Sequence, residues 1–161
     1  MKVIKQPPGH TKLIIALLYI VGIVLEGMIV YTYLDSDKAL ITASSKNDLA
    51  TVKQLLAEGV EIDIKDKLGK TALMYAAENG SNDIVKTLLE AKAAIDLKSN
   101  EGKTALMYAA QKGNVETVRL LLSKGADPNI KSSEGKTALI YATENKHESV
   151  VQVLNERGEE P

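Results

Sequence analysis

The pentapeptide GKTAL occurs three times, and its spacing constrains the fold more than any other feature of the chain. The three copies begin at Gly69, Gly102 and Gly135, so successive copies lie 33 residues apart. A fixed period of this size is typical of a repeat array, in which each unit packs only against its neighbours. One period further back, SDKAL at residues 36–40 lies on the same register. The sequence therefore predicts four stacked units.

The predicted repeat domain spans residues 36–158 and is followed by a short tail at residues 159–161. Its four units are residues 36–68, 69–101, 102–134 and 135–158. The same residue type recurs in every unit at four places: Leu40, Leu73, Leu106 and Leu139; Ala43, Ala76, Ala109 and Ala142; Val52, Val85, Val118 and Val151; and Leu55, Leu88, Leu121 and Leu154. These columns are expected to form the core.

Each unit is predicted to contain two short helices and an extended hairpin loop. In the second unit, Thr71 can cap a helix through ALMYAAENG that ends at Gly80, and NDIVKTLLEAK forms the second helix. The segment AIDLKSNE at residues 94–101 is too short and polar to continue that helix, and it leads into the turn residue Gly102. The expected fold class is all-α, a solenoid of helix-turn-helix units.

These residues resemble the ankyrin repeat over residues 36–158. The resemblance rests on the period of 33, on G-x-T-x-L-x-x-A-A at residues 69–77 and 102–110, and on LL-x-x-G-A-D-x-N at residues 121–129. Two positions of the family's Thr-Pro-Leu-His motif differ: Ala72, Ala105 and Ala138 replace Pro, and Met74, Met107 and Ile140 replace His. Ala keeps the helix. Apolar packing is expected to replace the Thr–His hydrogen bonds of the family.

The end units are expected to act as caps. Ser36 stands where the later units have the turn glycine, and Asn155 stands where three earlier units have Leu56, Leu89 and Leu122. A terminal repeat needs such a polar outer face for solubility. Four units are therefore expected to be the whole array.

An apolar stretch precedes the repeats. Residues 13–34 read LIIALLYIVGIVLEGMIVYTYL and contain one ionisable residue, Glu26. At ~1.5 Å per residue this stretch makes ~33 Å of helix, which matches the ~30 Å hydrocarbon core of a bilayer. The preceding tail, residues 1–12, carries three lysines, so the positive-inside rule places the N-terminus in the cytoplasm. We expect a single-pass signal anchor with the repeat domain outside the cytoplasm, periplasmic in a bacterium.

Other readings of this segment stay open. A cleaved signal peptide would also have a basic tail ahead of an apolar run, but cleavage after Gly27 would leave Leu25 at the −3 position, where a small residue is needed. In that case the domain would be exported. A buried helix of a soluble protein is a further alternative. Glu26 is either tolerated in the bilayer or contacts another helix of a membrane complex, of which the chain would be an accessory subunit.

The sequence argues against catalysis. There is no Cys, and the two His, His10 and His147, lie in different parts of the chain. Thiol chemistry and a paired-His metal site are therefore excluded. The GKT triplets resemble a P-loop, but the glycine required five residues upstream is replaced by Ile64, Leu97 and Ile130. A net charge of −1 gives no basic field for nucleic acid. We expect no enzyme, no cofactor, no metal and no small-molecule substrate.

The ankyrin resemblance implies that another protein binds to the concave face formed by the loop tips and first helices. The partner is expected in or near the membrane. Carried onto this register, the candidate residues are polar and vary between units: Lys67, Leu68, Lys70, Glu78, Asn79, Asn100, Glu101, Lys103, Gln111, Lys112, Lys124, Ser133, Lys136, Glu144, Asn145 and Arg157.

Two kinds of side chain in these units allow more than one interpretation. Lysines recur as Lys65, Lys98 and Lys131 and as Lys70, Lys103 and Lys136. They predict either a self-repelling, solvated surface or a site for anionic lipid or another polyanion. Tyrosines recur as Tyr75, Tyr108 and Tyr141. We expect them to pack between repeats with the hydroxyl at the edge of the stack, and stacking on a ligand is the alternative.

Overall fold

The computed structural model describes residues 38–158, apart from the side chains of residues 157 and 158. Within this range the chain forms α-helices joined by loops and turns, with no strand, so the predicted all-α class is confirmed. None of the described helices is both long and apolar enough to cross a bilayer. The predicted signal anchor at residues 13–34 and both tails lie outside the described residues.

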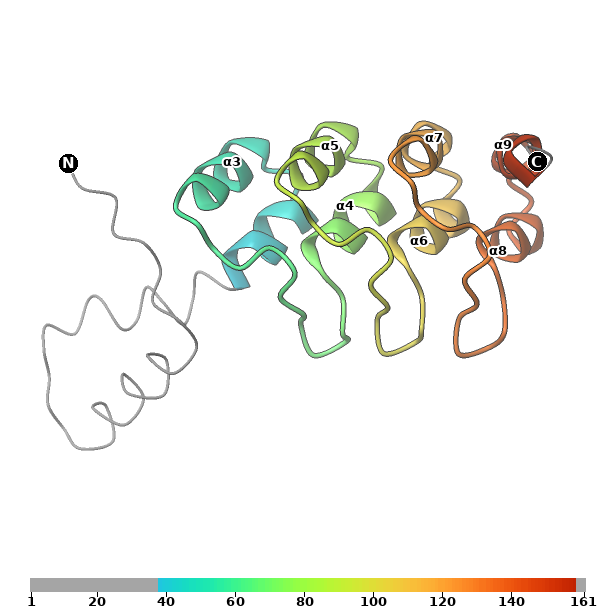
Figure 1. Ribbon diagram of the computed structural model, residues 1–161, viewed down its shortest axis with the longest axis horizontal. Coiled ribbons are helices and arrows are strands. Elements are labelled where there is room, and N and C mark those ends of the chain that lie inside the picture. Colours follow the sequence, from blue (N-terminus) through green and yellow to red (C-terminus); the bar gives the residue numbers. More distant parts are fainter. Residues whose placement is uncertain (1–37, 159–161) are drawn as a thin grey trace, which may run out of the picture.

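The described range contains eight helices, which form four pairs of consecutive helices in chain order (Figure 1). A helix over residues 38–45 precedes α3, and the later pairs are α4 with α5, α6 with α7, and α8 with α9. The bounds are α3 Leu49–Ala57, α4 Ala72–Asn79, α5 Asn82–Glu90, α6 Ala105–Lys112, α7 Val115–Ser123, α8 Ala138–Glu144 and α9 Glu148–Gly158. First helices form one row, second helices form another, and three hairpin loops extend on the side of the first row.

Local capping determines where the first helix of each inner unit begins and ends. The hydroxyl of Thr71 accepts a hydrogen bond from the Met74 backbone N–H at 3.4 Å, and Thr104 caps α6 in the same way at 3.4 Å. Gly80 ends α4 in the left-handed conformation, with φ 71°. Both predicted ends of the helix through ALMYAAENG are therefore confirmed. Thr137 stands at the start of α8, but its side chain makes no capping bond.

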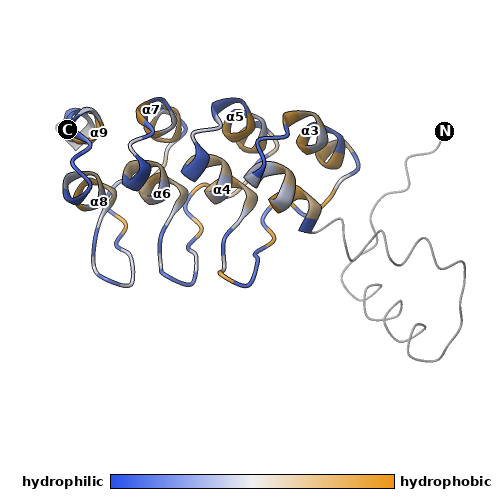
Figure 2. Ribbon diagram, turned by 180° about the vertical axis from the view of Figure 1, so that it is seen from behind, coloured by the Kyte–Doolittle hydropathy of each residue, from blue (hydrophilic) through white to orange (hydrophobic). Residues whose placement is uncertain are grey.

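The core lies between the two rows of helices and continues along the array. Leu40, Leu73 and Leu106 are buried, as are Val52, Val85 and Val118. Met74 and Met107, which replace the family's His, are buried too, so apolar packing does take the place of that residue. Figure 2 shows hydrophobic and hydrophilic colour on the same helices, as expected for helices that bury one face.

The hairpin loops, residues 58–71, 91–104 and 124–137, are held in register by the lysines and aspartates that recur in them. The ammonium of Lys65 donates to the backbone carbonyl of Lys98 at 2.7 Å, and Lys98 donates to that of Lys131 at 3.0 Å. The carboxylate of Asp63 accepts from the Ala94 N–H at 3.0 Å. Lys65, Lys98 and Lys131 are all exposed, as a solvated surface predicts, and the first two also bind the next loop.

The turns between paired helices also connect neighbouring units. The side-chain amide of Asn79 donates to the carbonyl of Ser45 at 2.8 Å, and the amide of Asn114 donates to the carbonyl of Glu78 at 2.8 Å. His147 repeats this pattern, with Nε2 3.1 Å from the carbonyl of Gln111. His147 lies in the turn directly before α9, which begins at Glu148.

Candidate partner-binding face

Eleven of the sixteen predicted residues lie on the loop tips or on the first helices. We call this surface the binding face. The loop-tip members are all exposed: Lys67, Leu68, Asn100, Glu101 and Ser133. The members on or directly after α4, α6 and α8 are exposed or partly buried: Glu78, Asn79, Gln111, Lys112, Glu144 and Asn145.

Two predicted residues are not placed with this surface. Lys124 directly follows α7 in the row of second helices, at the opposite end of its loop from the tip. Its exposed ammonium therefore does not join the binding face. Arg157 belongs to α9, and its side chain lies outside the described residues.

The remaining three, Lys70, Lys103 and Lys136, are not equivalent. Only 8% of the Lys70 side chain and 11% of the Lys103 side chain are exposed, against 31% for Lys136. The interpretation of this column as a solvated surface is therefore wrong for Lys70 and Lys103. The structure also argues against these two as ligands for anionic lipid, because their charges are enclosed by protein.

Tyrosine rings cover the two buried lysines. The ammonium of Lys70 lies 4.1 Å from the centroid of the Tyr75 ring in its own unit and 4.3 Å from that of Tyr108 in the next unit. Lys103 lies 5.7 Å from Tyr108 and 4.8 Å from Tyr141. Cation–π attraction operates at such distances. We call this alternating series, from Tyr75 through Lys136, the lysine–tyrosine ladder.

Glutamates on the solvent side of the ladder form ion pairs with its buried lysines. Lys70 forms an ion pair with Glu78, and Lys103 forms one with Glu101 at 2.9 Å. Burial by itself would lower the pKa of Lys103, but the hydrogen bond and charge of Glu101 outweigh burial and raise it. Glu101 itself is 64% exposed. The outer surface beside the ladder is therefore lined by carboxylates, with the lysine charges beneath them.

The last lysine of the ladder is held by two carboxylates. Lys136 contacts Glu144 at 2.9 Å and Glu134 at 3.0 Å. Hydrogen bonds to both carboxylates raise the pKa of Lys136, and the bond to Glu144 has the larger effect. The hydrogen bond from Lys136 lowers the pKa of Glu134. Glu134 was not among the predicted residues, although its register with Glu101 was a signal that could have identified it.

The tyrosine hydroxyls bind the hairpin loops. The hydroxyl of Tyr75 donates to the carboxylate of Asp66 at 2.7 Å, whereas Tyr108 bonds Ser99 at 3.0 Å and Tyr141 bonds Ser132 at 2.9 Å. The expectation that these hydroxyls lie at the edge of the stack is therefore wrong, because each one joins its helix to the loop before it. The loop residues were missed, since Asp and Ser at one register position do not look like a repeated column.

The hydrogen bond between Tyr75 and Asp66 shifts the pKa values of both side chains. The hydrogen bond to Asp66, together with burial, raises the pKa of Tyr75 to about 12. Burial favours a higher pKa for Asp66 as well, but hydrogen bonds from Tyr75 and from the backbone of Lys70 and Leu68 outweigh it and lower that pKa. Burial raises the pKa of Tyr108.

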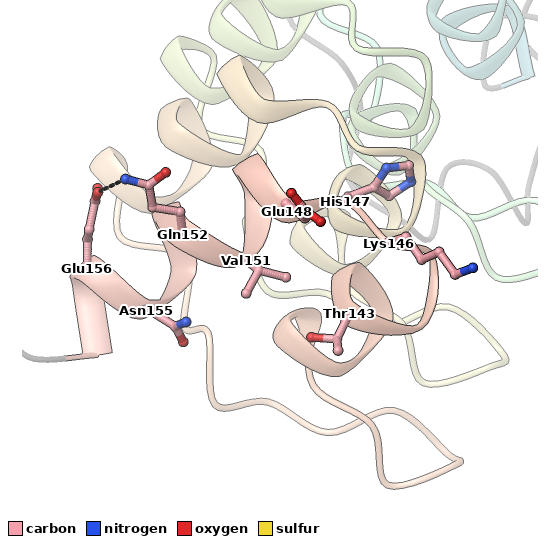
Figure 3. A pocket seen from close by; sticks show the side chains of 8 residues that line it. All are labelled: Thr143, Lys146, His147, Glu148, Val151, Gln152, Asn155 and Glu156. Carbon is pink, nitrogen blue, oxygen red and sulfur yellow. Dashed lines mark hydrogen bonds between the residues drawn. The ribbon is translucent and has the colours of Figure 1, made fainter.

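A hollow of about 740 Å³ opens on the last unit. Its lining side chains come from α8, from α9 and from the turn between them (Figure 3). Thr143 and Val151 line it, whereas the residues in register with them, Ala110 and Val118, are fully buried by the following unit. The hollow therefore lies on the end of the array that no further described unit covers.

The described residues offer this surface for contact. Nowhere between residues 38 and 158 do three or more His, Asp or Glu side chains gather as metal ligands would. His147 is occupied with the carbonyl of Gln111. What the binding face provides is exposed carboxylate, ammonium, amide and hydroxyl groups on a row of similarly placed loops.

Comparison with known proteins identifies the family. The mitochondrial disaggregase of Homo sapiens is 44% identical over 48 residues, which are 30% of this chain and 7% of that protein. This chain thus spans only a small part of that relative's length. The family model for ankyrin repeats, in three copies, matches residues 39–132 and again residues 96–161. Together these matches cover most of the chain, which therefore belongs to the ankyrin repeat family of protein-interaction modules.

Proposed function

We propose that this protein is a membrane-tethered, non-catalytic adaptor that holds a partner protein at the membrane surface through its binding face. The observation that carries the proposal is the contrast between repeated core columns and a variable face. Lys67, Asn100 and Ser133 share one register position, yet they differ in size and charge. Packing makes the buried columns repeat, whereas an exposed position is free to vary and can be matched to a partner.

Rigidity of the face also supports the proposal. The side-chain amide of Asn100 donates to the carbonyl of Lys67 at 3.0 Å, and the N–H of Ser133 donates to the carbonyl of Glu101 at 3.0 Å. Each loop tip is therefore bonded to its neighbour. A pre-organised surface loses less conformational entropy when a partner binds, which favours affinity.

The tether is proposed from the sequence. The apolar residues 13–34 end only a few residues before the first described helix, at residues 38–45. A span there would hold the first unit close to the headgroups and restrict how the binding face is oriented. We propose a cytoplasmic N-terminus and a repeat domain outside the cytoplasm, with a partner in or near the membrane; export after signal cleavage is the alternative.

Binding of anionic lipid through the lysine columns is less well supported. An approaching lipid headgroup would meet the exposed carboxylate of Glu101 before the buried ammonium of Lys103. The role of Glu26 in a membrane complex concerns a residue outside the described range and stays a prediction.

Fractionation tests the tether. The full chain should stay with the membrane pellet after extraction with alkaline carbonate, which removes peripheral proteins. A variant lacking residues 13–34 should appear in the soluble fraction with the same helical circular dichroism per repeat. Recovery of the intact full chain in the carbonate supernatant would contradict an uncleaved anchor.

Matched charge reversals test the binding face. Lys67→Glu with Lys112→Glu alters two exposed ammonium groups of the face, whereas Lys53→Glu with Lys86→Glu makes the same charge change on the second helices. Captured from membranes with a mild detergent, the first variant should lose partners that the wild type and the second variant retain. Equal loss from both variants, or from neither, would contradict binding through this face.

A further inference from the structure

The lysine–tyrosine ladder repeats one arrangement in the inner units. In each of them an ammonium lies between the ring of its own unit and the ring of the following unit, as Lys70 does between Tyr75 and Tyr108. Lys103 occupies the same place between Tyr108 and Tyr141. The following unit therefore supplies half of the aromatic environment of each lysine.

The arrangement is incomplete at the end of the array. Lys136 lies 5.7 Å from the centroid of the Tyr141 ring in its own unit, and the described residues place no further ring on its other side. Its side chain is 31% exposed, about three times as much as that of Lys103. Glu134 and Glu144 keep the ammonium in the position that its counterparts occupy. Lys136 is thus pre-organised, with one side open.

An apolar side chain of α8 is uncovered in the same way. Ile140 is 40% exposed, whereas Met74 and Met107, at the same register position, are 1% exposed because the next unit covers them. The hollow on α8 and α9 continues this uncovered end. Both Lys136 and Ile140 are therefore more exposed than their counterparts in the third unit.

We propose that the open side of Lys136 is a binding site for an aromatic side chain, tryptophan or tyrosine, carried by a segment of the partner protein. The inference rests on the proposed function of protein binding and adds the chemistry of the partner. The inner units act as the template, since Tyr108 and Tyr141 show which group fits against these lysines. Tryptophan gives the strongest cation–π attraction. The exposed carboxylates of Glu134 and Glu144 would accept N–H groups of the same segment.

A second copy of this chain does not fit the site by continuing the stack. In the first unit the register position of Tyr75, Tyr108 and Tyr141 is held by Thr42. Head-to-tail stacking would therefore present a hydroxyl and a methyl group to Lys136. A second copy stacked in this way therefore does not supply the missing ring.

Selection from displayed peptides tests the site with defined probes. A phage-displayed library of short random peptides is panned on the immobilised full chain in mild detergent, and selected peptides are synthesised for affinity measurements by fluorescence anisotropy. We expect the selected peptides to share a tryptophan or tyrosine. Replacing that residue by leucine should weaken binding, and Lys136→Met should weaken it about twofold to fivefold, as expected for an exposed cation–π contact.

Two controls make the result specific. Lys136→Arg keeps the cation and should retain binding, while Lys131→Met removes an exposed lysine of the same loop and should leave the affinity unchanged. Circular dichroism of each variant checks that the array is folded. If selected peptides lack an aromatic residue, or bind Lys136→Met as tightly as wild type, the aromatic site is wrong but protein binding stands.

Two other outcomes would contradict more than the aromatic site. If no peptide is selected over a blank surface, the aromatic site and the proposed binding function both fail. If the full chain forms dimers in a concentration-dependent way and Lys136→Met abolishes them, the occupant is a second copy of the chain and the proposed partner segment is wrong.

Discussion

The third and fourth units share the sequence GKTAL, yet the residues of this segment lie in different surroundings. In the third unit, Lys103, Leu106 and Met107 are buried. In the fourth, Lys136 and Leu139 are partly exposed and Ile140 is 40% exposed. The local helices are alike, so the difference comes from the unit that follows. In this array, burial is decided by the neighbour along the stack, 33 residues away, more than by local sequence.

The same comparison explains why one end of the molecule is suited to binding. Inner units satisfy their own apolar and cationic groups with the next repeat. The last unit keeps Lys136, Leu139 and Tyr141 in the same positions without that cover. Polar Thr143, Glu148 and Asn155 replace Ala110, Val115 and Leu122 of the third unit. The end is thus a partial cap that leaves Ile140 and Lys136 accessible.

Truncation of a core leucine should give the largest difference in stability between the third and fourth units. Leu106→Ala removes a fully buried side chain and should lower the free energy of unfolding by about 3 kcal/mol. Leu139→Ala, at the same register position but only partly buried, should cost about 1 kcal/mol. Urea unfolding followed by circular dichroism measures both. Equal losses would show that the fourth unit is covered as completely as the third.

Turn glycines give the next largest contrast. Gly102 and Gly135 have φ of 71° and 76°, so alanine at either costs about 1 kcal/mol in backbone strain. A Cβ at Gly102 would also lie 2.6 Å from the Ser133 nitrogen, whereas at Gly135 it would meet nothing within 4 Å. Displacing Ser133 breaks its bond to Glu101, which adds about 1 kcal/mol. Thermal unfolding should therefore rank Gly102→Ala below Gly135→Ala, and the reverse order would contradict the loop contact.

Loss of the helix N-cap should give a smaller difference in stability between the two units. Thr104→Ala removes a hydroxyl that bonds the Met107 N–H, and it should cost about 1 kcal/mol. Thr137→Ala removes a hydroxyl without such a bond, and it should change stability by less than about 0.5 kcal/mol. Chemical denaturation of the two variants side by side tests this pair. A loss at Thr137 as large as that at Thr104 would mean that the fourth unit is capped after all.

The last contrast concerns the opposite end of the ladder and appears only at high pH. Tyr75 bonds a carboxylate, whereas Tyr108 and Tyr141 bond serine hydroxyls. The bond to Asp66 raises the pKa of Tyr75 to about 12 from its ordinary value of 10.0. The unfolded chain loses this proton first, so the stabilisation is complete below about pH 10 and is lost as the pH rises toward about 12.

Absorbance titration of tyrosinate measures this shift. The difference between wild type and Tyr75→Phe should show a midpoint near about pH 12. Asp66→Ser installs the residue type found in the other two units and should move the midpoint back toward the ordinary value. A midpoint near about 10 in the wild type would contradict the Tyr75–Asp66 hydrogen bond.

The repeats and their helices were predictable because their signals are local and periodic. Thr71 and Gly80 mark the ends of α4 in the sequence itself, and the leucine and valine columns mark the core. The surface was harder to predict. Lys70 looks solvated in the sequence because the ring of Tyr108 that covers it belongs to the next unit. Lys124 was placed on the binding face although it directly follows α7, because register alone does not say which layer a loop end belongs to.

Methionine oxidation tests most directly whether the next unit decides burial and leaves the last unit open. In the variant Ile140→Met, α4, α6 and α8 each carry a methionine at the same register position, residues 74, 107 and 140. The rate at which peroxide oxidises a methionine follows the exposure of its side chain. Peptide mass spectrometry should find the introduced methionine oxidised several times faster than Met74 and Met107, which are 1% exposed. Equal oxidation rates at the three positions would contradict the open end of the array, and with it the site at Lys136.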